Sequence, residues 1–401
     1  MQTRDVVIVS LARTPFGKFG GTLKDVPVVD LGIMAAKEVL KRANVDEKAV
    51  EEVNVGHCAS SEAECASVVG RQISLATGIP PEVMTTTIDT ACCSSLIAVR
   101  LGYQSIQAHR ISTALALGVE SMSRTPFILP QNLRWGQRLG HITASDGLFE
   151  LGYKGYNPVS VDAGEVALEY NVDREEQDRW AFRSQQRYAK ANEERKFKDE
   201  IVPIEVPSRK GPPIVFDTDE QPRPNTTIEK LAKLPTIYGS PTVTPGNAPG
   251  LNDGAAGILL MSAEKAKEMG ISPLATIISA VGRSTHPRYI ATIPGLVIQD
   301  ALKKADLTID DVDLIEINEA FAAMPLVSSK VLADGDEKKT EEIREKINVN
   351  GGAVAIGHPV GASGARILMT LIYELRRRGG GCGVAAICGG LAQGESMVVR
   401  V

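Results

Sequence analysis

Several features that mark particular classes of protein are scarce in this sequence. Aromatic residues make up only 4% of its 401 residues, too few for a surface that stacks nucleic-acid bases. The formal net charge of −5 argues against a broad basic surface for nucleic acid. No apolar run approaches the roughly 18–20 residues that a membrane span needs, and the N-terminus lacks the long apolar stretch of a signal peptide. We therefore expect a cytoplasmic protein without nucleic-acid or membrane partners.

Cysteine is also sparse, with six residues in the whole chain, which is too few for a disulfide scaffold. No two cysteines form a Cys-x-x-Cys pair, so we expect no structural zinc site and no metal. The rest of the composition is ordinary for a globular protein. Hydrophobic residues make up 43% and charged residues 23% of the chain, which is enough apolar material for a large core. The cysteines are Cys58, Cys65, Cys92, Cys93, Cys382 and Cys388.

Short β-like runs alternate with helical stretches, a pattern that predicts a layered α/β fold. Apolar residues recur at helical spacing in the first helical stretch. We predict strands over Asp5–Ser10, Glu51–Gly56, Thr85–Asp89, Thr113–Val119 and Gly254–Ser262, and helices over Val29–Ala43 and Ser95–Ala108.

Two segments of the chain repeat one pattern. Leu40–Gly56 and Leu302–Asn318 are related by a constant offset of 262 residues (302 − 40 = 318 − 56 = 262). Each indicates a helix end, a polar loop and then a strand, and the apolar positions of the two strands coincide. Because self-similarity at a fixed offset is typical of duplication, we predict two similar halves.

A segment of different texture separates these halves. Residues 121–245 are rich in Arg, Gln, Glu and Pro, and we interpret them as an insertion in the first half. Within it we predict a charged helix over Asp173–Ala191, with Asp173 as its N-cap, and an extended loop over Pro203–Pro224. In the second half, the polar run Asp334–Lys346 predicts a solvated surface insertion.

Cys92 carries the sharpest chemical signal. A β-like run leads into it and a helix of small residues leads away, which places it at a strand-to-helix turn. A helix N-terminus there would lower the pKa of the thiol and offer backbone N–H donors to an oxyanion. The alternative is a small buried hydrophobe, and we adopt that interpretation for the adjacent Cys93.

Three further residues could act with such a thiol. His358 lies in a glycine-rich loop that a substrate can approach closely, and histidine is the usual partner that activates a cysteine. Cys388 ends a buried strand and is either an acid–base group or a small hydrophobe. Asn318 ends a strand, where open α/β sheets collect ligands. The glycines Gly379–Gly381 precede a strand rather than follow one, which excludes a dinucleotide-binding loop.

Taken together, these segments resemble the thiolase family, and within it the acetyl-CoA C-acetyltransferase type. The resemblance runs nearly end to end. It implies two duplicated α/β halves, each on a five-stranded mixed sheet, stacked in five αβαβα layers, with an inserted loop domain. The implied division is 1–120 plus 246–272, 121–245, and 273–401, and the implied assembly is a homodimer or homotetramer. The matching segments are Val9–Gly17, Gly246–Ala255, Asn318–Ala322, Gly351–Arg366 and the loop after Cys388.

The resemblance also implies roles for residues at matching positions. Cys92 would be the nucleophile that is acylated, His358 would activate it, and Cys388 would exchange the proton at the α-carbon of a second acyl-CoA. Asn318, through a water, would bind the oxygen of that second thioester together with His358. The backbone N–H groups of Cys92 and Gly390 would form the other oxyanion hole. Residues implied to lie along the CoA and acyl channel are Arg223, Leu148, Pro249, Ala320 and Phe321.

The implied reaction joins two acetyl-CoA molecules into acetoacetyl-CoA and CoA, or runs in reverse, by ping-pong acyl-cysteine chemistry and without a cofactor beyond CoA. A thiolase for longer or branched 3-ketoacyl-CoA is the alternative, and a non-catalytic acyl-CoA-binding subunit is a remoter one. The run Asp89–Cys92 also looks like the elbow of a β-ketoacyl synthase, but the Asn318 and Cys388 segments argue against it. Oxidation could join Cys92 to Cys388 if their backbones are close enough.

The chain departs from the family pattern at three places. Pro249 stands where a serine usually contacts the pantetheine, and it has neither a hydroxyl nor an N–H donor. Val159–Gly164 replaces a motif usually written Met-Gly-x-Thr-Ala-Glu, and a nearby histidine of many biosynthetic members is missing. Leu391 and Ala392 replace glycines of the last loop.

Overall fold

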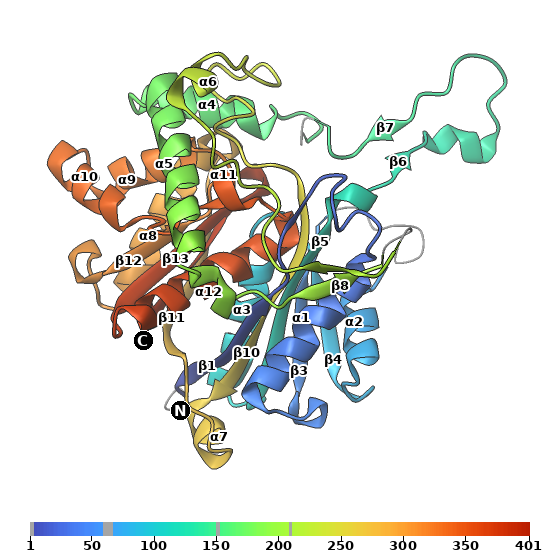
Figure 1. Ribbon diagram of the computed structural model, residues 1–401, viewed down its shortest axis with the longest axis vertical. Coiled ribbons are helices and arrows are strands. Elements are labelled where there is room, and N and C mark those ends of the chain that lie inside the picture. Colours follow the sequence, from blue (N-terminus) through green and yellow to red (C-terminus); the bar gives the residue numbers. More distant parts are fainter. Residues whose placement is uncertain (1–3, 59–66, 150–152, 208–210) are drawn as a thin grey trace.

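The computed structural model describes residues 4–58, 67–149, 153–207 and 211–401 (Figure 1), so Cys65 lies outside the described residues. The strands of the first half are β1 (Val6–Arg13), β2 (Gly17–Lys18), β3 (Glu52–Gly56), β4 (Met84–Ile88), β5 (Thr113–Ser121) and β10 (Asn252–Ser262). Those of the second half are β11 (Ala275–Ser284), β12 (Leu314–Ile317), β13 (Cys382–Gly389) and β14 (Gln393–Arg400).

The two halves share one strand order. The first half is ordered β4-β3-β5-β10-β1, with β3 parallel to both of its neighbours, and β2 pairs with β10. The second half repeats this order as β12-β13-β14-β11, with β12 parallel to β13. A short antiparallel contact between β1 and β11, at Val7↔Thr276 and Ile8↔Ala275, joins the two sheets edge to edge. The predicted duplication is confirmed.

The second sheet has four strands instead of the five that were expected. At the place of β4, the second half has a single parallel bridge between Ile315 and Ile347. The side chain of Asn348 then takes over the pairing, because its amide accepts from the N–H of Ile317 at 2.9 Å and donates to the C=O of Ile317 at 2.8 Å. A side-chain amide thus satisfies backbone groups that a fifth strand would otherwise pair.

The repeated segments adopt the same conformation. Helix α1 (Val28–Ala43) ends at Asn44, and helix α8 (Ile293–Lys304) is followed by Asp306, exactly 262 residues further along (306 − 44 = 262). Both Asn44 and Asp306 have a φ of 53°, a left-handed conformation that Asn and Asp tolerate better than most residues. A short 3₁₀ turn and a strand follow in each copy.

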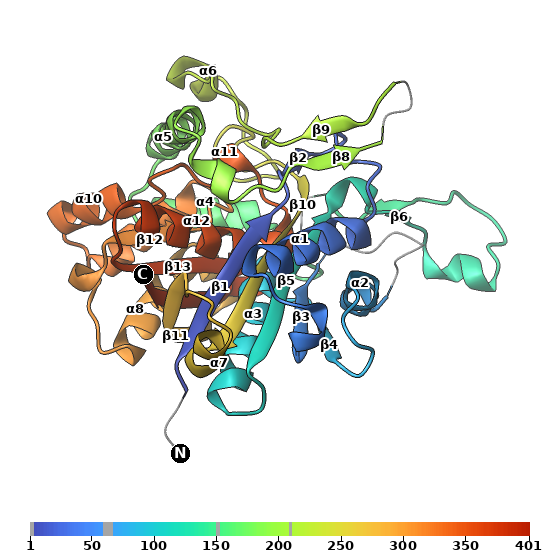
Figure 2. The ribbon, with the colours of Figure 1, turned by 60° about the horizontal axis from the view of Figure 1, so that its bottom comes forward.

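Five layers build the body of the molecule, as Figures 1 and 2 show. Helices α1 and α2 (Val69–Thr77) cover the outer face of the first sheet, while α8 and α9 (Ala323–Leu332) cover that of the second. Helices α3 (Ser94–Gln107) and α12 (Ser363–Arg377) contact each other between the sheets. Leu96 and Leu368 on these two helices are fully buried, and such burial contributes about 1.5–3 kcal/mol per side chain. The αβαβα prediction is confirmed.

The helices of the inserted segment cover the second half. Its helices are α4 (Val159–Glu169), α5 (Arg174–Glu193) and α6 (Ile228–Ala232), and α4 contacts α9 while α5 contacts α11 (Ala353–Ile356). The predicted N-cap of α5 is confirmed, since the Asp173 carboxylate accepts from the N–H of Glu176 at 2.7 Å. An arm with β6 (Phe127–Ile128) and β7 (Ser145–Asp146) projects from the body (Figure 1).

One loop prediction was wrong. The region Pro203–Pro224 contains a hairpin of β8 (Ile204–Val206) and β9 (Ile214–Phe216), because Ile204, Val206 and Phe216 are buried against the first half. The polar run Asp334–Lys346, predicted as a solvated surface insertion, forms helix α10 (Glu337–Lys346), which packs against α9 through Ile343 and leaves most of its charged residues exposed. The ends of the other predicted strands and helices lie within three residues of the observed ends. Helix α7 (Ala263–Glu268), which was not predicted, follows β10. No helix in the described part of the chain is long and apolar enough to cross a bilayer.

Candidate active site

The predicted catalytic residues meet where parallel strands of both halves end. Cys92 lies between β4 and α3, Asn318 directly follows β12, and Cys388 is near the end of β13. His358 comes from the loop between α11 and α12. The residue before the thiol, Ala91, has a φ of 52°, a left-handed conformation that turns the chain sharply from β4 toward α3. Carboxyl ends of parallel strands are the usual ligand-binding edge of an open α/β sheet.

A direct contact joins the thiol and the imidazole. The Nε2 atom of His358 lies 3.1 Å from the Sγ atom of Cys92, and its Nδ1 atom lies 2.6 Å from the Oγ atom of Ser363. The Ser363 hydroxyl donates its hydrogen to the C=O of Pro359 at 2.9 Å. It therefore accepts a hydrogen bond from Nδ1–H, which leaves a lone pair on Nε2 facing the thiol.

Asn318 contacts the same ring nitrogen of His358 that faces the thiol. Its Nδ2 atom lies 3.4 Å from Nε2 of His358, and the guanidinium of Arg366 donates to its Oδ1 atom at 3.4 Å. Because the guanidinium can only donate, this contact fixes which end of the Asn318 amide faces His358. Arg366 is itself fully buried and lies 3.5 Å from the Glu316 carboxylate.

Burial governs the electrostatics of these groups. It raises the pKa of the Cys92 thiol well above its ordinary value, with the nearby Cys388 adding to the shift, and it raises the pKa of Cys388 to about 12. Burial, followed by the charge of Arg366, lowers the pKa of His358 to about 3. The predicted lowering of the Cys92 pKa by the helix N-terminus was wrong, because desolvation of the thiolate outweighs the helix in this enclosed site.

A cavity of about 340 Å³ collects nine of the ten predicted site residues. Asn318 is the tenth; it is fully buried beside His358 and does not line the cavity. A concave, mostly apolar space with a few convergent polar groups is typical of a small-molecule site. The nine residues are Cys92, His358, Cys388, Gly390, Arg223, Leu148, Pro249, Ala320 and Phe321.

Sequence reasoning missed two residues that orient His358 and one that lines the cavity. The backbone N–H of His358 donates to the Asn252 Oδ1 atom at 2.9 Å, and Ser363 holds the ring as described above. Ser363 follows His358 by five residues at the start of α12, and both it and Asn252 lie inside the segments that carry the family resemblance. Tyr153 also lines the cavity, and no motif in the sequence points to it.

The residues that depart from the family pattern lie at or near the cavity. Pro249 and Val159 line the cavity. Leu391 and Ala392 each have a φ of 55°, so they adopt the left-handed conformation that glycine provides without strain. The described cysteines are free thiols, and no group of three or more His, Cys, Asp or Glu residues in that part of the chain could hold a metal ion.

A thiol, an imidazole that can take its proton and a second thiol in one cavity are the groups that acyl transfer through a cysteine requires. The chain belongs to the thiolase family: the model for the thiolase N-terminal domain matches residues 6–264 and the model for the C-terminal domain matches residues 271–401.

Individual thiolases resemble the chain over nearly its full length. An acetyl-CoA acetyltransferase of Syntrophomonas wolfei is 44% identical over 99% of both chains. The crystal structure of the Bacillus anthracis acetyl-CoA acetyltransferase has a TM-score of 0.92 and 40% identity, and covers 100% of this chain and 99% of its own. Human mitochondrial 3-ketoacyl-CoA thiolase in complex with CoA has a TM-score of 0.92 and 38% identity, with 99% and 98% covered.

Proposed function

We propose that this protein catalyses the reversible condensation of two acetyl-CoA molecules to acetoacetyl-CoA and CoA, with thiolysis as the reverse reaction. The observation that carries the proposal is the 3.1 Å contact between Cys92 Sγ and His358 Nε2, in a cavity that also contains Cys388. The acetyl-CoA acetyltransferases that resemble the whole chain support the acetyl group as the unit transferred.

The first half-reaction forms an acetyl-enzyme. The Cys92 thiol gives its proton to Nε2 of His358 as the sulfur attacks the carbonyl carbon of acetyl-CoA. The backbone N–H groups of Cys92 and Gly390 would donate to the oxygen that becomes negative, and one such donor is typically worth about 10²–10³ in rate. The C–S bond to CoA breaks, and the departing CoA sulfur takes the proton from His358.

The second half-reaction needs a carbanion. Cys388 first gives its thiol proton to Nε2 of His358, and its sulfur then removes a proton from the α-carbon of a second acetyl-CoA, while His358 and Asn318, the latter through a water, stabilise the enolate oxygen. The enolate carbon attacks the acetyl group on Cys92, the C–S bond to the enzyme breaks as the Cys92 sulfur takes the proton from His358, and acetoacetyl-CoA forms. Holding both reactants in one cavity makes this step effectively unimolecular.

The raised thiol pKa values fit this sequence of events. With the pKa of Cys388 near 12 and that of His358 near 3, the resting thiols stay protonated and the imidazole stays neutral. Neutral groups in an enclosed site exchange protons only when a thioester and its preorganised donors are present. This arrangement protects the thiols from unproductive reaction between turnovers.

The remaining assignments follow from the same proposal. Arg223, Leu148, Pro249, Ala320 and Phe321 would contact the CoA and acyl groups, which suits their place on the cavity wall. No cofactor beyond CoA is needed for these steps. We further propose the three-part division of the chain given above, a cytoplasmic location and a homodimeric or homotetrameric assembly.

Thiolysis assays test the proposed function. Free CoA and acetoacetyl-CoA are supplied to the wild-type protein and to Cys92→Ala, beside 3-ketoacyl-CoA substrates of six and eight carbons. We expect strong activity on the four-carbon substrate that is lost in the variant. A preference for the longer chains would move the assignment to a 3-ketoacyl-CoA thiolase, and inactivity on every substrate would favour a binding subunit.

A further inference from the structure

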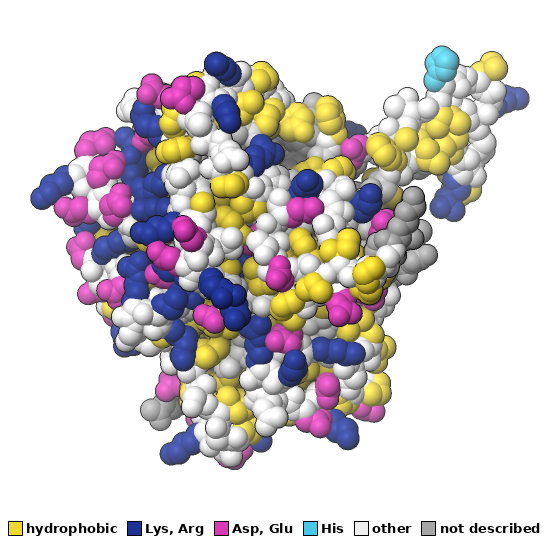
Figure 3. Space-filling view, viewed as in Figure 1, with side chains coloured by type: hydrophobic (Ala, Val, Ile, Leu, Met, Phe, Trp, Pro, Cys, Tyr) yellow, Lys and Arg dark blue, Asp and Glu magenta, His cyan; other side chains and the backbone are white. Residues whose placement is uncertain are grey.

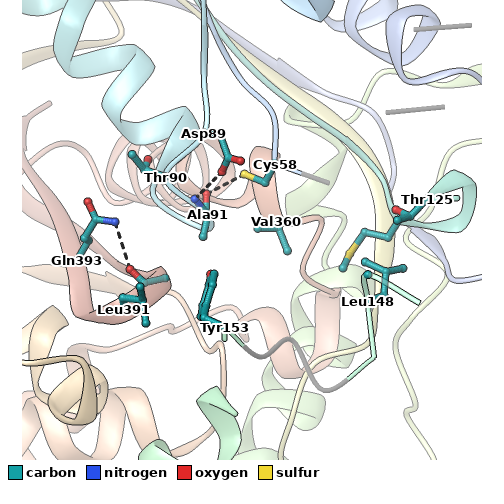
Figure 4. Close-up of a pocket in the computed structure, with 13 residues that line it drawn as sticks. Cys58, Asp89, Thr90, Ala91, Thr125, Leu148, Tyr153, Val360, Leu391 and Gln393 are labelled. Carbon is teal, nitrogen blue, oxygen red and sulfur yellow. Dashed lines mark hydrogen bonds between the residues drawn. The ribbon is translucent and has the colours of Figure 1, made fainter. Parts of the chain in front are cut away.

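A second cavity, of about 370 Å³, adjoins the one that holds Cys92. The two cavities share part of their walls, so they are neighbours rather than separate sites. Leu391, Asp89 and Gln393 line the second cavity and not the first (Figure 4). The shared residues are Ala91, Met122, Leu148, Tyr153, Val360 and Gly390.

Tyr153 stands at the junction of the two cavities. Figure 4 shows its ring between Leu391 and Val360, below Ala91. Its phenol oxygen occupies the space that a Cβ atom on Gly390 would need, so the ring sits directly on the backbone of that glycine. Burial raises the pKa of Tyr153 to about 12, and the proximity of Cys92 adds to the shift, in agreement with this location beside the thiol.

The neighbouring Leu391 has an unusual backbone. Its φ and ψ of 55° and 44° are left-handed, a conformation that L-residues other than glycine, asparagine and aspartate rarely adopt. Residues in such sparsely populated conformations cluster at active sites, which makes the Leu391 side chain a candidate for a role in this one. The side chain lines the second cavity across the Tyr153 ring from Val360 (Figure 4).

In thiolysis, Cys92 attacks the 3-keto carbon, so the carbons beyond it extend past the thiol and away from CoA. We propose that Tyr153 and Leu391 form a wall that ends the acyl pocket and restricts the protein to short acyl groups. The inference rests on the proposed function and specifies its substrate. Met122 and Leu148, which line both cavities, are apolar and would favour a longer chain that passes into the second cavity if the ring were removed.

The test compares substrate preference in matched variants. The ratio of kcat/KM for the eight-carbon 3-ketoacyl-CoA to that for acetoacetyl-CoA is measured for wild type, Tyr153→Ala, Tyr153→Phe and Leu391→Gly. Tyr156→Ala is the control, because Tyr156 is a nearby exposed tyrosine that lines neither cavity. We expect the ratio to rise at least tenfold in Tyr153→Ala and Leu391→Gly, since one methylene in an apolar pocket is worth about 10–200-fold.

The Tyr153→Phe and Tyr156→Ala variants should keep the wild-type ratio, because the wall is the ring rather than its hydroxyl. An unchanged ratio in Tyr153→Ala and Leu391→Gly would overturn the inference, and so would a wild-type protein that already prefers eight carbons. Leu391→Gly keeps the test decisive if Tyr153→Ala does not fold, because glycine suits that backbone. Loss of all thiolysis in the wild type would instead refute the proposed function itself.

Discussion

His358 shows at the scale of a single residue how packing sets chemistry. The ring is held at Nδ1 by Ser363 and at its backbone N–H by Asn252, and its Nε2 atom faces Cys92. The glycine-rich segment around His358 made the residue a candidate. The direction of the pKa shifts was beyond sequence reasoning, because the desolvation that causes them comes from both halves of the fold packing around one site.

The buried neutral imidazole predicts an acid-sensitive stability. The unfolded chain protonates His358 near its ordinary pKa of 6.5, whereas the folded chain does so only near 3. Between these values the unfolded state binds more protons, so this residue makes the free energy of unfolding fall as pH falls, by up to about 1.4 kcal/mol per pH unit. Above pH 6.5 it makes no such contribution.

Urea unfolding of wild type and His358→Asn between pH 4 and 7 measures this effect. As pH falls from 7 to 4, we expect the free energy of unfolding to decrease more in the wild type than in His358→Asn, because the variant has no imidazole at this position to protonate. His286→Asn, at an exposed histidine, should track the wild type. A pH-independent difference between wild type and His358→Asn would contradict the account.

At the scale of elements, the loop between α11 and α12 depends on one glycine. Gly357 has a φ of 106°, and a Cβ atom there would lie 2.5 Å from the side chain of Asn252. Since Asn252 accepts from the His358 N–H, a clash at this point displaces the imidazole. Gly335 offers a matched comparison, because it has a φ of 81° with open space around its Cα.

We expect Gly357→Ala to lower kcat/KM for acetoacetyl-CoA thiolysis about 100-fold, the typical cost of misplacing a catalytic group by about 1 Å. Gly335→Ala should cost only about 1–3 kcal/mol of stability through backbone strain, with kcat/KM unchanged. Thiolysis kinetics and thermal unfolding of both variants separate the two effects. Equal loss of activity in the two variants would show that strain alone, rather than the contact with Asn252, is responsible.

Elements were predictable where local pattern and tertiary context agree. The repeat at an offset of 262 residues predicted matching helices and strands. The structure has them, and Asn44 and Asp306 even share the same left-handed backbone conformation. The hairpin of β8 and β9 was missed because its strands have three residues each, too few to show alternation. The fifth strand of the second half was expected wrongly, because the side chain of Asn348 replaces its backbone pairing.

At the scale of the whole molecule, the duplication followed from the repeat and the five layers from the family resemblance, whereas the position of the inserted helices over the second half followed from neither. That position depends on contacts such as Trp180 Nε1–H to Glu319 and Ser184 Oγ–H to Glu319, which join residues more than 130 apart. The boundaries of the three-part division and the roles of the site residues stay predictions.

The projecting arm bears on assembly. Trp135 and Leu139 on it are 82% and 93% exposed, and Figure 3 shows hydrophobic side chains gathered on the arm. Because large exposed apolar clusters mark association sites, we expect the arm to contact a second copy of the chain. In analytical ultracentrifugation, Trp135→Asp/Leu139→Asp should form smaller assemblies than wild type, while Leu168→Asp, at an exposed leucine on α4, should not. A monomeric wild type would contradict the proposed assembly.

The central claim is that Cys92 accepts an acyl group that Cys388 then helps to condense. Intact mass spectrometry after mixing with acetyl-CoA tests it most directly, on wild type, Cys92→Ala and Cys388→Ala. We predict one added acetyl group in the wild type and in Cys388→Ala, whose acetyl-enzyme should persist, and none in Cys92→Ala. Acetylation of Cys92→Ala to the wild-type extent, or an unmodified wild type, would contradict the account.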